Sequence, residues 1–558
     1  MSSNSLEFSR FVDAAETMEN ESGKLAKIEH ASDLLGIAGA DVGIAARFIQ
    51  GDIFPAWDNR KVSVGSVLVY KALAEASGLT RDEIESRVAD VGDPGLVCEQ
   101  LDIESDSGQV TLGERDGLTV SRVYEVFCEL ATTEGSGSQQ RKIDLINTLL
   151  FDASGREAKF IVRLLLGKMR IGVGGGTVRR AISEAFGVDE STVKRGVMVT
   201  NDVEVVAMAA RDGGSEAVSE LSVELGRPIK PMLAQKTSKS EALSDAGVDG
   251  EVLVEWKYDG ARLQPHVTED GVRLFTRRMN EVTDSMPDVC AAIEAGVSTS
   301  SAVLDCEVVA YKPDSSEPEP FQEVMRRLRR KHDIKETAKD ISLQVHVFDV
   351  LYADGESVLD LDSRSRRKTL ESIVDPSMIA EQWVATSADE IASIEQESLE
   401  AGHEGVMVKS PTATYQPDNR GKNWVKIKPD VETLDCVVVG GEWGEGRRAE
   451  WVGTFMLAVQ DEDESELKRV GKVATGLTDS QLESLTERLK PLIQSENGSK
   501  IEFKPELVFE VGCEEIQQSS TYNSGYGLRF PRYICTREDK SIADADTQSR
   551  VQRLYANQ

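Results

Sequence analysis

The sequence lacks any long apolar run. No stretch of about 18 consecutive apolar residues occurs, which excludes an ordinary membrane-spanning helix. The opening residues, MSSNSLEFSRF, show no basic flank followed by an apolar stretch. We therefore expect no secretory signal and a cytoplasmic location.

Cysteine is also sparse, and its spacing excludes two kinds of site. No two cysteines form a Cys-x-x-Cys pair, so a disulfide framework and a four-cysteine zinc site are both unsupported. We expect buried, reduced thiols. The seven cysteines are Cys98, Cys128, Cys290, Cys306, Cys436, Cys513 and Cys535.

Basic residues are too few to balance the acidic ones. The chain of 558 residues holds 64 lysines and arginines against 97 aspartates and glutamates, a formal net charge of −33. Taken alone, this surplus of acid argues against a polyanionic partner. A hydrated acidic surface also suits a cytoplasm rich in salt, so halophilic adaptation is one hypothesis and general solubility is the alternative.

The chain is long enough for about three domains. Helical spacing of apolar residues prevails to about residue 225. The segment 226–235 holds two prolines and marks a boundary. Strand-like runs then alternate with helical ones, and closely spaced short strands follow. We predict a multidomain α, α/β and β fold, with a helical domain over 1–225, an α/β domain over 226–430 and a small β-barrel over 431–558.

Lys257 is the candidate nucleophile. It lies in EWKYDGAR, where a strand-like run ends in an Asp-Gly turn signal. A nucleophilic lysine must lose its proton, so we expect nearby cations or desolvation to lower its pKa. This segment alone is explained equally well by a solvated lysine beside a hairpin.

Six ordered motifs carry a resemblance to the ATP-dependent DNA ligases, particularly the archaeal replicative type, over nearly the whole chain. They are KYDGAR (257–262), LDCEVVAY (304–311), FDVLYADG (348–355), EGVMVK (404–409), NWVKIK (423–428) and LRFPR (528–532). The resemblance implies a helical DNA-binding domain, a nucleotidyltransferase (adenylation) domain and a C-terminal OB-fold. It also implies ATP as co-substrate and nicked double-stranded DNA as partner.

Within this resemblance the matched residues acquire nucleotide-binding roles. Charged groups would bind ribose and phosphate oxygens, and an aromatic ring would stack on the purine. The candidates are Glu255 for the adenine amino group, Arg262 and Arg277 for ribose and phosphate, Glu307 for ribose hydroxyls, and Phe348 for stacking. A paired structural glutamate and a core phenylalanine remain the plain alternatives for the last two.

Phosphate neutralisation is assigned to carboxylate-held Mg²⁺ and to a pair of lysines. Glu404, with Glu307, is expected to help hold Mg²⁺, because hard cations choose oxygen ligands. Lys426 and Lys428 alternate with Ile427, so both would face one side of a strand, stabilise one phosphate and depress the pKa of Lys257. Arg420 would add a further phosphate contact.

The reaction that the resemblance implies has three steps. Lys257 attacks the α-phosphorus of ATP, AMP passes to the 5′-phosphate at a nick, and the 3′-hydroxyl then displaces AMP. Arg529 and Arg532 of the last domain would act only in the first step, by orienting the pyrophosphate. Asp259 would position the 3′-hydroxyl or a metal, or merely cap the turn.

DNA binding by so acidic a chain requires local clusters of cations and backbone N–H groups. The basic runs are 159–170, 326–331 and 419–428. The glycine-rich stretches 135–142 and 170–177 would offer N–H groups to phosphate, and flexible connectors are their alternative. Family analogy also suggests a sliding clamp as partner, for which QVTL (109–112) is very weak support, and a chain that acts as a monomer.

Other functions stay open on the sequence. An mRNA-capping enzyme or an RNA ligase would keep the Lys-x-Asp-Gly core and a small barrel, but the large helical region favours duplex DNA. NAD-dependent ligases resemble the chain poorly. A non-catalytic DNA-binding scaffold is disfavoured because every motif position is intact.

Overall fold

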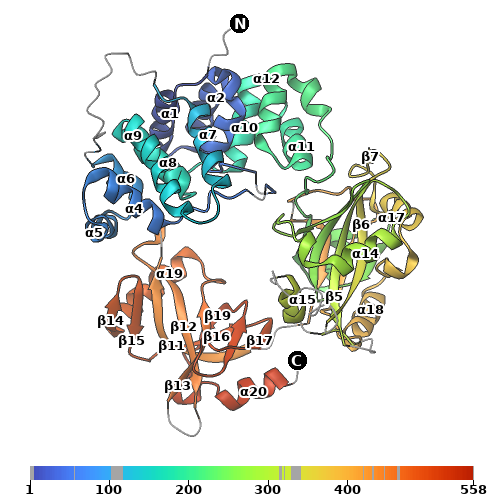
Figure 1. Cartoon of the computed structure of the whole chain (residues 1–558). Coiled ribbons are helices and arrows are strands. Elements are labelled where there is room, and N and C mark those ends of the chain that lie inside the picture. The colour runs from blue at the N-terminus through green and yellow to red at the C-terminus, as the bar shows by residue number, and fades with distance from the viewer. Residues whose placement is uncertain are drawn as a thin grey trace, which may run out of the picture. The chain divides into compact units, whose positions relative to one another are not determined.

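The computed structural model describes residues 5–55, 57–58, 60–101, 103, 117–312, 317–319, 321–328, 341–418, 420–429, 433–444, 446–461 and 466–556. These residues form two compact units, Met1–Lys428 and Pro429–Gln558. Each unit is described by itself below, and Figure 1 labels the helices and strands.

The first part of unit Met1–Lys428 is helical, as predicted (Figure 1). The helices are α1 (Phe8–Asn20), α2 (Lys24–Ile37), η1 (Gly39–Asp41), α3 (Val42–Gln50), α4 (Ser66–Ser77), α5 (Arg81–Val91), α6 (Pro94–Glu99), α7 (Val120–Thr132), α8 (Ser138–Asp152), α9 (Gly155–Leu165), α10 (Gly175–Phe186), α11 (Glu190–Thr200) and α12 (Val203–Ser219).

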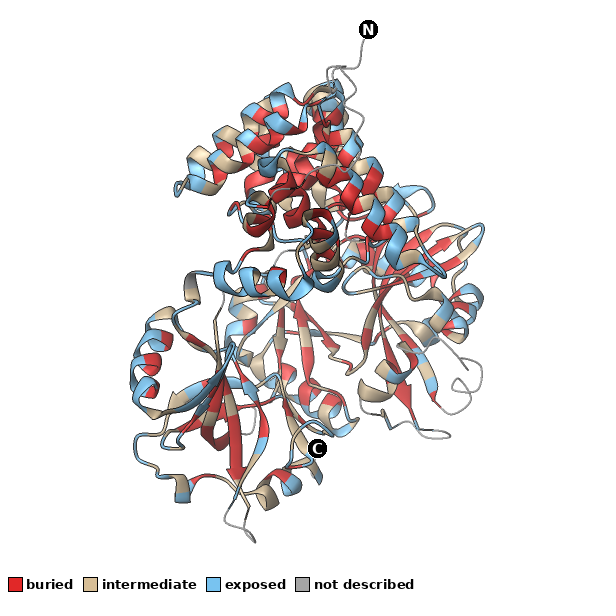
Figure 2. Cartoon of the chain, turned by 60° about the vertical axis from the view of Figure 1, so that its left-hand side comes forward, coloured by how far each residue is buried: buried red, intermediate tan, exposed pale blue. Residues whose placement is uncertain are grey.

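Apolar residues at helical spacing form the core of these helices. The predicted face of α1 is buried at Phe8, Phe11, Val12 and Ala15. Helix α9 starts at a capping box and buries its apolar face in the same cluster. Figure 2 shows buried residues on the inward faces of these helices and exposed ones on the outward faces.

Part of the first predicted basic run, 159–170, is buried and paired, which corrects the expectation that the whole run is open to DNA. Lys159 and Arg163 of α9 are only 7% and 2% exposed at the side chain, and both pair with Glu19 of α1. Arg163 also pairs with Asp93 at 2.7 Å. Charged residues on the apolar face of a helix need such partners, because an unpaired buried charge is too costly.

In the second basic run, 326–331, the same correction applies to Arg327 alone, since Arg326 is 57% exposed at the side chain. Arg327 is 1% exposed at the side chain and pairs with Asp288 at 2.5 Å. Residues 329–331 lie outside the described residues, as does the segment 109–112 that suggested a clamp contact.

The second part of this unit contains two five-stranded sheets. Their strands are β1 (Leu233–Lys236), β2 (Val252–Trp256), β3 (Ala261–Thr268), β4 (Gly271–Thr276), β5 (Ala302–Tyr311), β6 (Ser342–Ala353), β7 (Glu356–Ser357), β8 (Gln382–Ala385), β9 (Val406–Lys409) and β10 (Arg420–Ile427). The helices are α13 (Lys239–Ala246), η2 (Thr283–Ser285), α14 (Pro287–Gly296), α15 (Phe321–Leu328), α17 (Ser363–Ile373), η3 (Pro376–Met378) and α18 (Ala388–Glu400).

Each sheet packs helices on one face only. The sheet of order β1-β10-β9-β2-β8 packs α13 and α18, and the sheet of order β4-β3-β5-β6-β7 packs α14, α15 and α17. Every strand pair is antiparallel except β1 with β10. The opposite faces share a cluster in which Trp424 of β10 meets Val303 and Leu351 of the second sheet. The polar side chains described below lie between these two faces.

Unit Pro429–Gln558 is rich in β-strands, as predicted. The strands are β11 (Thr433–Trp443), β12 (Val452–Gln460), β13 (Leu467–Val473), β14 (Ile493–Asn497), β15 (Lys500–Phe503), β16 (Val508–Gly512), β17 (Glu515–Gln518), β18 (Tyr526–Arg529) and β19 (Arg532–Thr536). Its helices are η4 (Gly446–Arg448), α19 (Asp479–Leu489), η5 (Lys490–Leu492), η6 (Ile542–Asp544) and α20 (Gln548–Ala556).

Strand β11 bends so that its two halves pair with different strands. Residues 433–437 pair with β16, and residues 440–442 pair with β15. The crossing depends on glycine, because a Cβ on Gly440 would lie 2.7 Å from the Ile501 carbonyl oxygen. This arrangement is consistent with the expected OB-fold barrel.

The cysteines are reduced and mostly buried, as predicted. All seven cysteines are free, five of them buried and Cys128 and Cys535 half-buried. Among the described residues, no helix has the length and apolar character needed to cross a membrane.

Candidate active site

Lys257 immediately follows β2, and β3 begins four residues later at Ala261, so the predicted strand-to-turn position is confirmed. The turn requires glycine at its last position, because a Cβ on Gly260 would lie 2.4 Å from the Val308 carbonyl oxygen. The alternation of β2 buries Val252 and Val254 against the outer helices. Glu255 and Lys257 therefore project from the opposite face, toward the second sheet.

The segment before β9 is bonded directly to Lys257. The Lys257 N–H donates to the Gly405 carbonyl oxygen at 2.8 Å, and the Glu404 N–H donates to the Lys257 carbonyl oxygen at 2.9 Å. Gly405 has φ +123°, and a Cβ there would lie 2.3 Å from the Ile427 carbonyl oxygen. The backbone thus fixes Glu404 next to the amine.

The side chains of these two residues form an ion pair. The Lys257 ammonium donates a hydrogen bond to the Glu404 carboxylate, which also pairs with Lys428 at 2.9 Å. Burial alone would raise the pKa of Glu404, but the two ammonium groups hold it well below its ordinary value.

The pKa of Lys257 is raised, which contradicts the expectation of a lowered value. Burial does lower it, but the carboxylates of Glu404 and Glu307 outweigh burial. Lys428 does not act on Lys257 as predicted, because it shares the Glu404 carboxylate and leaves an acceptor beside the amine. In this structure Lys257 is held as an ammonium.

Glu307 lies on β5, paired in register with Arg262 of β3. Burial raises the pKa of its carboxyl to about 8, although Lys257 and Arg262 act in the opposite direction. Because burial makes the Glu307 carboxyl difficult to ionise, a cation that binds together with the substrate would stabilise its carboxylate form.

Arg262 is anchored by Asp305, two residues before Glu307. Its Nε donates to Asp305 Oδ1 at 2.9 Å and its Nη2 to Asp305 Oδ2 at 2.6 Å. Arg277 makes no ion pair within the described part of the chain. Partial burial and the nearby charges of Arg262 and Arg420 lower the pKa of Arg277. Glu307 opposes this shift only in part, so the gathered positive charges suit an anionic ligand.

The predicted adenine end of the site is more polar than expected. The Glu255 carboxylate pairs with Lys409 at 2.6 Å and accepts a hydrogen bond from Gln382 Nε2 at 2.7 Å. The Lys409 ammonium lies 5.0 Å from the ring centroid of Phe348 and 4.5 Å from that of Trp424. The side chain of Glu255 is therefore already occupied in this structure.

The predicted alternation of β10 is confirmed. Val425 and Ile427 pack against α13 and α18, whereas Trp424 belongs to the cluster between the sheets. Lys426 and Lys428 therefore share the face that carries the site. Arg420 starts the same strand and is exposed.

Three further residues of the site were not singled out from the sequence. Asp305, Lys409 and Tyr415 are all buried and all engage predicted residues. A signal existed for the first two, since each is a charged residue within an otherwise apolar strand segment. Tyr415 offers no such signal in a polar loop sequence.

The C-terminal motif lies in unit Pro429–Gln558. Arg529 pairs with Glu515 at 2.5 Å, and Arg532 is exposed at the start of β19. Between them Phe530 is 64% exposed and has φ +49°, a left-handed conformation that is uncommon for phenylalanine.

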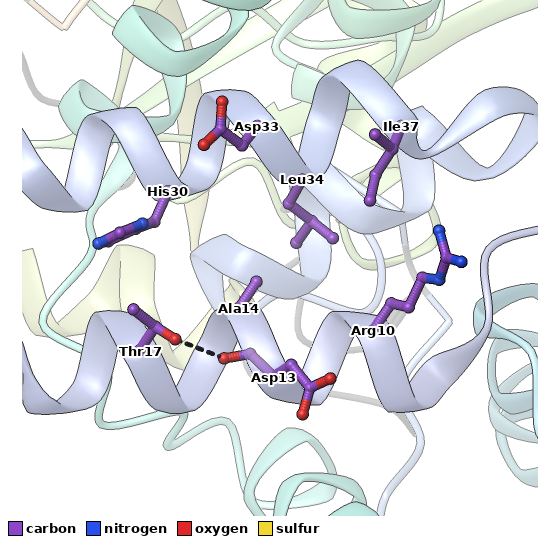
Figure 3. Close-up of a pocket in the computed structure, with 8 residues that line it drawn as sticks. All are labelled: Arg10, Asp13, Ala14, Thr17, His30, Asp33, Leu34 and Ile37. Atoms are coloured by element: carbon purple, nitrogen blue, oxygen red, sulfur yellow. Dashed lines mark hydrogen bonds between the residues drawn. The ribbon is translucent and has the colours of Figure 1, made fainter.

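A surface hollow between α1 and α2 is a different kind of feature (Figure 3). Its volume is about 350 Å³, and its lining includes His30, Asp13 and Arg10. Among the described residues, no three His, Cys, Asp or Glu side chains group to hold a metal ion, here or elsewhere. The chemistry-bearing groups gather instead around Lys257.

Comparison with known proteins agrees with this placement. Three family models match the chain: "DNA ligase N terminus" over 7–183, "ATP dependent DNA ligase domain" over 231–428, and "ATP dependent DNA ligase C terminal region" over 448–540.

Curated relatives match over almost the whole chain. A DNA ligase of Natronomonas pharaonis is 47% identical over 554 residues, covering 98% of this chain and 100% of the relative. A DNA ligase of Archaeoglobus fulgidus is 45% identical over 535 residues, covering 95% and 93%. A solved structure, "Pmar-Lig_PreS3", has a TM-score of 0.59 at 17% identity and covers 94% of this chain and 99% of that one, which shows the shared fold.

The fold, the amine at a strand end and these matches define the protein as an enzyme that joins DNA, a nucleotide-dependent ligase. The chain belongs to the ATP-dependent DNA ligase family.

Proposed function

We propose that the protein seals nicks in double-stranded DNA in replication, recombination and repair, with Lys257 as the residue that carries AMP. The observation that carries this proposal is the position of the Lys257 amine, at a strand end between Glu307 and Glu404 and on the same face as Lys426 and Lys428. In the first step a bond forms between Nζ and the α-phosphorus of ATP, and the bond from that phosphorus to pyrophosphate breaks.

The amine attacks only after its ion pair with Glu404 opens and its proton leaves, because an ammonium has no free electron pair. Glu404 and Glu307 would hold Mg²⁺. Two carboxylates fit this ion, which usually takes one or two protein carboxylates and completes its shell with substrate phosphates and water. When bound, Mg²⁺ supplies positive charge that neutralises the phosphates and draws the carboxylates away from the amine.

The remaining site residues are proposed to bind the adenine, the ribose and the phosphates of ATP. Phe348 stacks on the purine, and Glu255, after exchange with Lys409 or through its backbone, accepts the adenine amino group. Charged side chains bind ribose and phosphate: Arg262, Arg277, Arg420, Lys426, Lys428 and, in the first step, Arg532. Asp259 is proposed to place the 3′-hydroxyl or a metal in the last step.

The helical region, 1–225, is proposed to hold the DNA. Helices α8 and α10 both start after glycine-rich loops, at Gly137 and Gly174, and neither N-terminus has a side-chain cap. Uncapped N–H groups at a helix start are ready donors for phosphate oxygens. Lys168 and Arg170, the exposed remainder of the first basic run, precede α10.

The proposal extends to three functional domains, 1–225, 226–430 and 431–558, acting as one chain in the cytoplasm. A salt-rich cytoplasm would account for the net charge of −33, and several curated relatives come from organisms such as Haloarcula marismortui and Halobacterium salinarum. A sliding clamp is a further partner that family analogy suggests.

One experiment tests the proposed reaction. The protein is incubated with ATP, dATP, GTP or NAD, its intact mass is measured, and each sample is then given nicked DNA. The proposal predicts one AMP per chain with ATP and a sealed strand afterwards. Labelling by GTP would indicate a capping enzyme, and labelling by NAD but not ATP would indicate the other class of ligase.

A further inference from the structure

The segment between the helical region and the first sheet is bonded along its length to one strand. We call residues 226–232 the strap. Three side chains on one face of β3, at alternate positions, each hydrogen-bond one strap residue. The pairs are Gly226 with His266, Ile229 with Gln264, and Met232 with Arg262.

These bonds are specific in both directions. The Gly226 N–H donates to His266 Nδ1 at 2.9 Å. Gln264 closes a two-way pair with the backbone of Ile229, accepting its N–H at 2.7 Å and donating to its carbonyl oxygen at 3.0 Å. His266 and Gln264 are both buried, so the strap contributes partners that the strand would otherwise lack.

The three strap residues that hydrogen-bond to β3 are spaced three residues apart. Gly226 has φ +85°, outside the polyproline II region, whereas Ile229 and Met232 are separated by one turn of a polyproline II chain. Pro228 and Pro231 directly precede these two residues and favour that conformation. The prolines restrict the backbone of the strap, and its hydrogen bonds hold it along β3.

Tyr415 joins the end of the strap to Arg262. Its hydroxyl accepts the Met232 N–H at 3.0 Å and an Arg262 Nη2–H at 3.2 Å, and it donates to Asp305 Oδ2 at 2.8 Å. A tyrosine hydroxyl has one donor and two acceptor positions, so all three are used. The side chain is 3% exposed.

Arg262 is consequently fixed on three sides. Asp305 takes two of its five N–H groups, Tyr415 a third, and the Met232 carbonyl oxygen a fourth, at 2.8 Å from Nη1. None of these four contacts uses the fifth N–H group, which is the second one on Nη1. The charge of Arg262 is felt by Glu307 and Arg277, so the guanidinium borders the nucleotide site.

We propose that Tyr415 and the strap are a positioning device for Arg262, holding its guanidinium so that its charge and last N–H donor meet the nucleotide. This inference rests on the proposed function, in which Arg262 binds ATP. A guanidinium fixed before binding loses little freedom when the nucleotide arrives, so the device acts on affinity and not on the chemical step.

The test is the single-turnover rate of lysyl-AMP formation in the full-length protein as a function of ATP concentration, with Mg²⁺ and without DNA. The half-saturating ATP concentration is called KM below, and the maximal rate constant is called kcat. Tyr415→Phe removes the hydroxyl alone. We expect its KM for ATP to rise about tenfold, the effect of one hydrogen bond to a charged group, with kcat within about twofold. Tyr352→Phe, a half-buried tyrosine of β6, is the matched control and leaves both constants unchanged.

A double-mutant cycle separates positioning from general loss of packing. In an Arg262→Ala background Tyr415→Phe should leave KM unchanged, because the group that it positions is gone. Equal effects of Tyr415→Phe in both backgrounds would overturn the proposal. Pro231→Gly, which loosens the strap without touching the hydroxyl, is the second variant and should raise KM in the same direction even if Tyr415→Phe fails to fold.

The outcomes also separate this inference from the function on which it rests. If Arg262→Ala raises KM and both Tyr415→Phe and Pro231→Gly leave it unchanged, the positioning device is refuted and the ATP-binding role of Arg262 stands. If Arg262→Ala itself leaves KM unchanged, the proposed role of Arg262 is refuted and the inference with it.

Discussion

Lys257 and Glu404 are joined through both backbone and side chain. The Glu404 N–H donates to the Lys257 carbonyl oxygen at 2.9 Å, and the Lys257 ammonium donates to the Glu404 carboxylate. The backbone bond keeps the two residues together when the side-chain pair opens. The Lys257 amine can therefore leave Glu404 for another partner while the end of strand β2, which precedes Lys257, stays in place.

The pKa of Lys257 should fall when Glu404 loses its charge. Glu404→Gln removes a carboxylate that stabilises the ammonium, so the amine should react with an amine-selective label at lower pH than in the wild type. The measurement is the labelling of the Lys257 peptide against pH, without metal or ATP. Glu400→Gln, an exposed change at the end of α18, is the control. An unshifted profile in Glu404→Gln would contradict the ion pair.

Acid should destabilise the fold through His266. Burial lowers the pKa of His266 from 6.5 to about 3, so below pH 6.5 the unfolded chain binds a proton that the folded chain refuses. The contribution of His266 to the free energy of unfolding is complete above about pH 6.5. It is lost as the pH falls below that value, by up to about 1.4 kcal/mol per pH unit.

The check is Tm against pH for the wild type and for His266→Gln, whose amide oxygen can still accept the Gly226 N–H. The variant should show a shallower fall in Tm between pH 6.5 and 4. Parallel curves for the two proteins would show that His266 carries no such linkage.

Two arginines from one basic run should behave in opposite ways. Arg163 is buried beside Asp93 and Glu19, so Arg163→Met removes the close partner of the buried Asp93 carboxylate and should cost about 3–5 kcal/mol of unfolding free energy. Arg170 is 44% exposed at the side chain, so Arg170→Ala should leave stability nearly unchanged and weaken binding to nicked DNA.

Salt titration of DNA binding distinguishes the roles of these two arginines. The DNA-binding constant falls with salt, and loss of one phosphate contact makes the plot of log K against log salt less steep by about 1. Arg170→Ala should show that change. A full loss of DNA affinity in a folded Arg163→Met protein would contradict the structural role of Arg163.

Ligation should be fastest at high salt. A chain with a net charge of −33 repels DNA when screening is weak, and salt reduces that repulsion. The measurement is the initial rate of nick sealing across a range of KCl and NaCl concentrations. An optimum below about 0.15 M would refute salt adaptation without touching the ligase family.

Local pattern was enough to predict the main elements and the placement of several candidate site residues. Alternation along 424–428 predicted one face for Lys426 and Lys428, and the strand ending in Asp-Gly predicted the position of Lys257. These features depend on neighbours within a few residues, which the sequence states directly.

What the sequence could not give depends on contacts between distant segments. The sign of the pKa shift at Lys257 is decided by Glu404, 147 residues away. The burial of Arg163 depends on Glu19, 144 residues away, and without that partner its charge suggested a DNA contact. The strap was expected only as a boundary, because its bonds to β3 follow from tertiary pairing that no local period reveals.

The central claim is that the amine of Lys257 becomes bonded to AMP. The most direct measurement is the intact mass of wild type and Lys257→Ala after incubation with ATP and Mg²⁺, with peptide mapping of any adduct. The wild type should gain one AMP on Lys257, and Lys257→Ala should gain none while it still binds nicked DNA. An AMP adduct on Lys257→Ala, or one mapped to another residue of the wild type, would contradict the account.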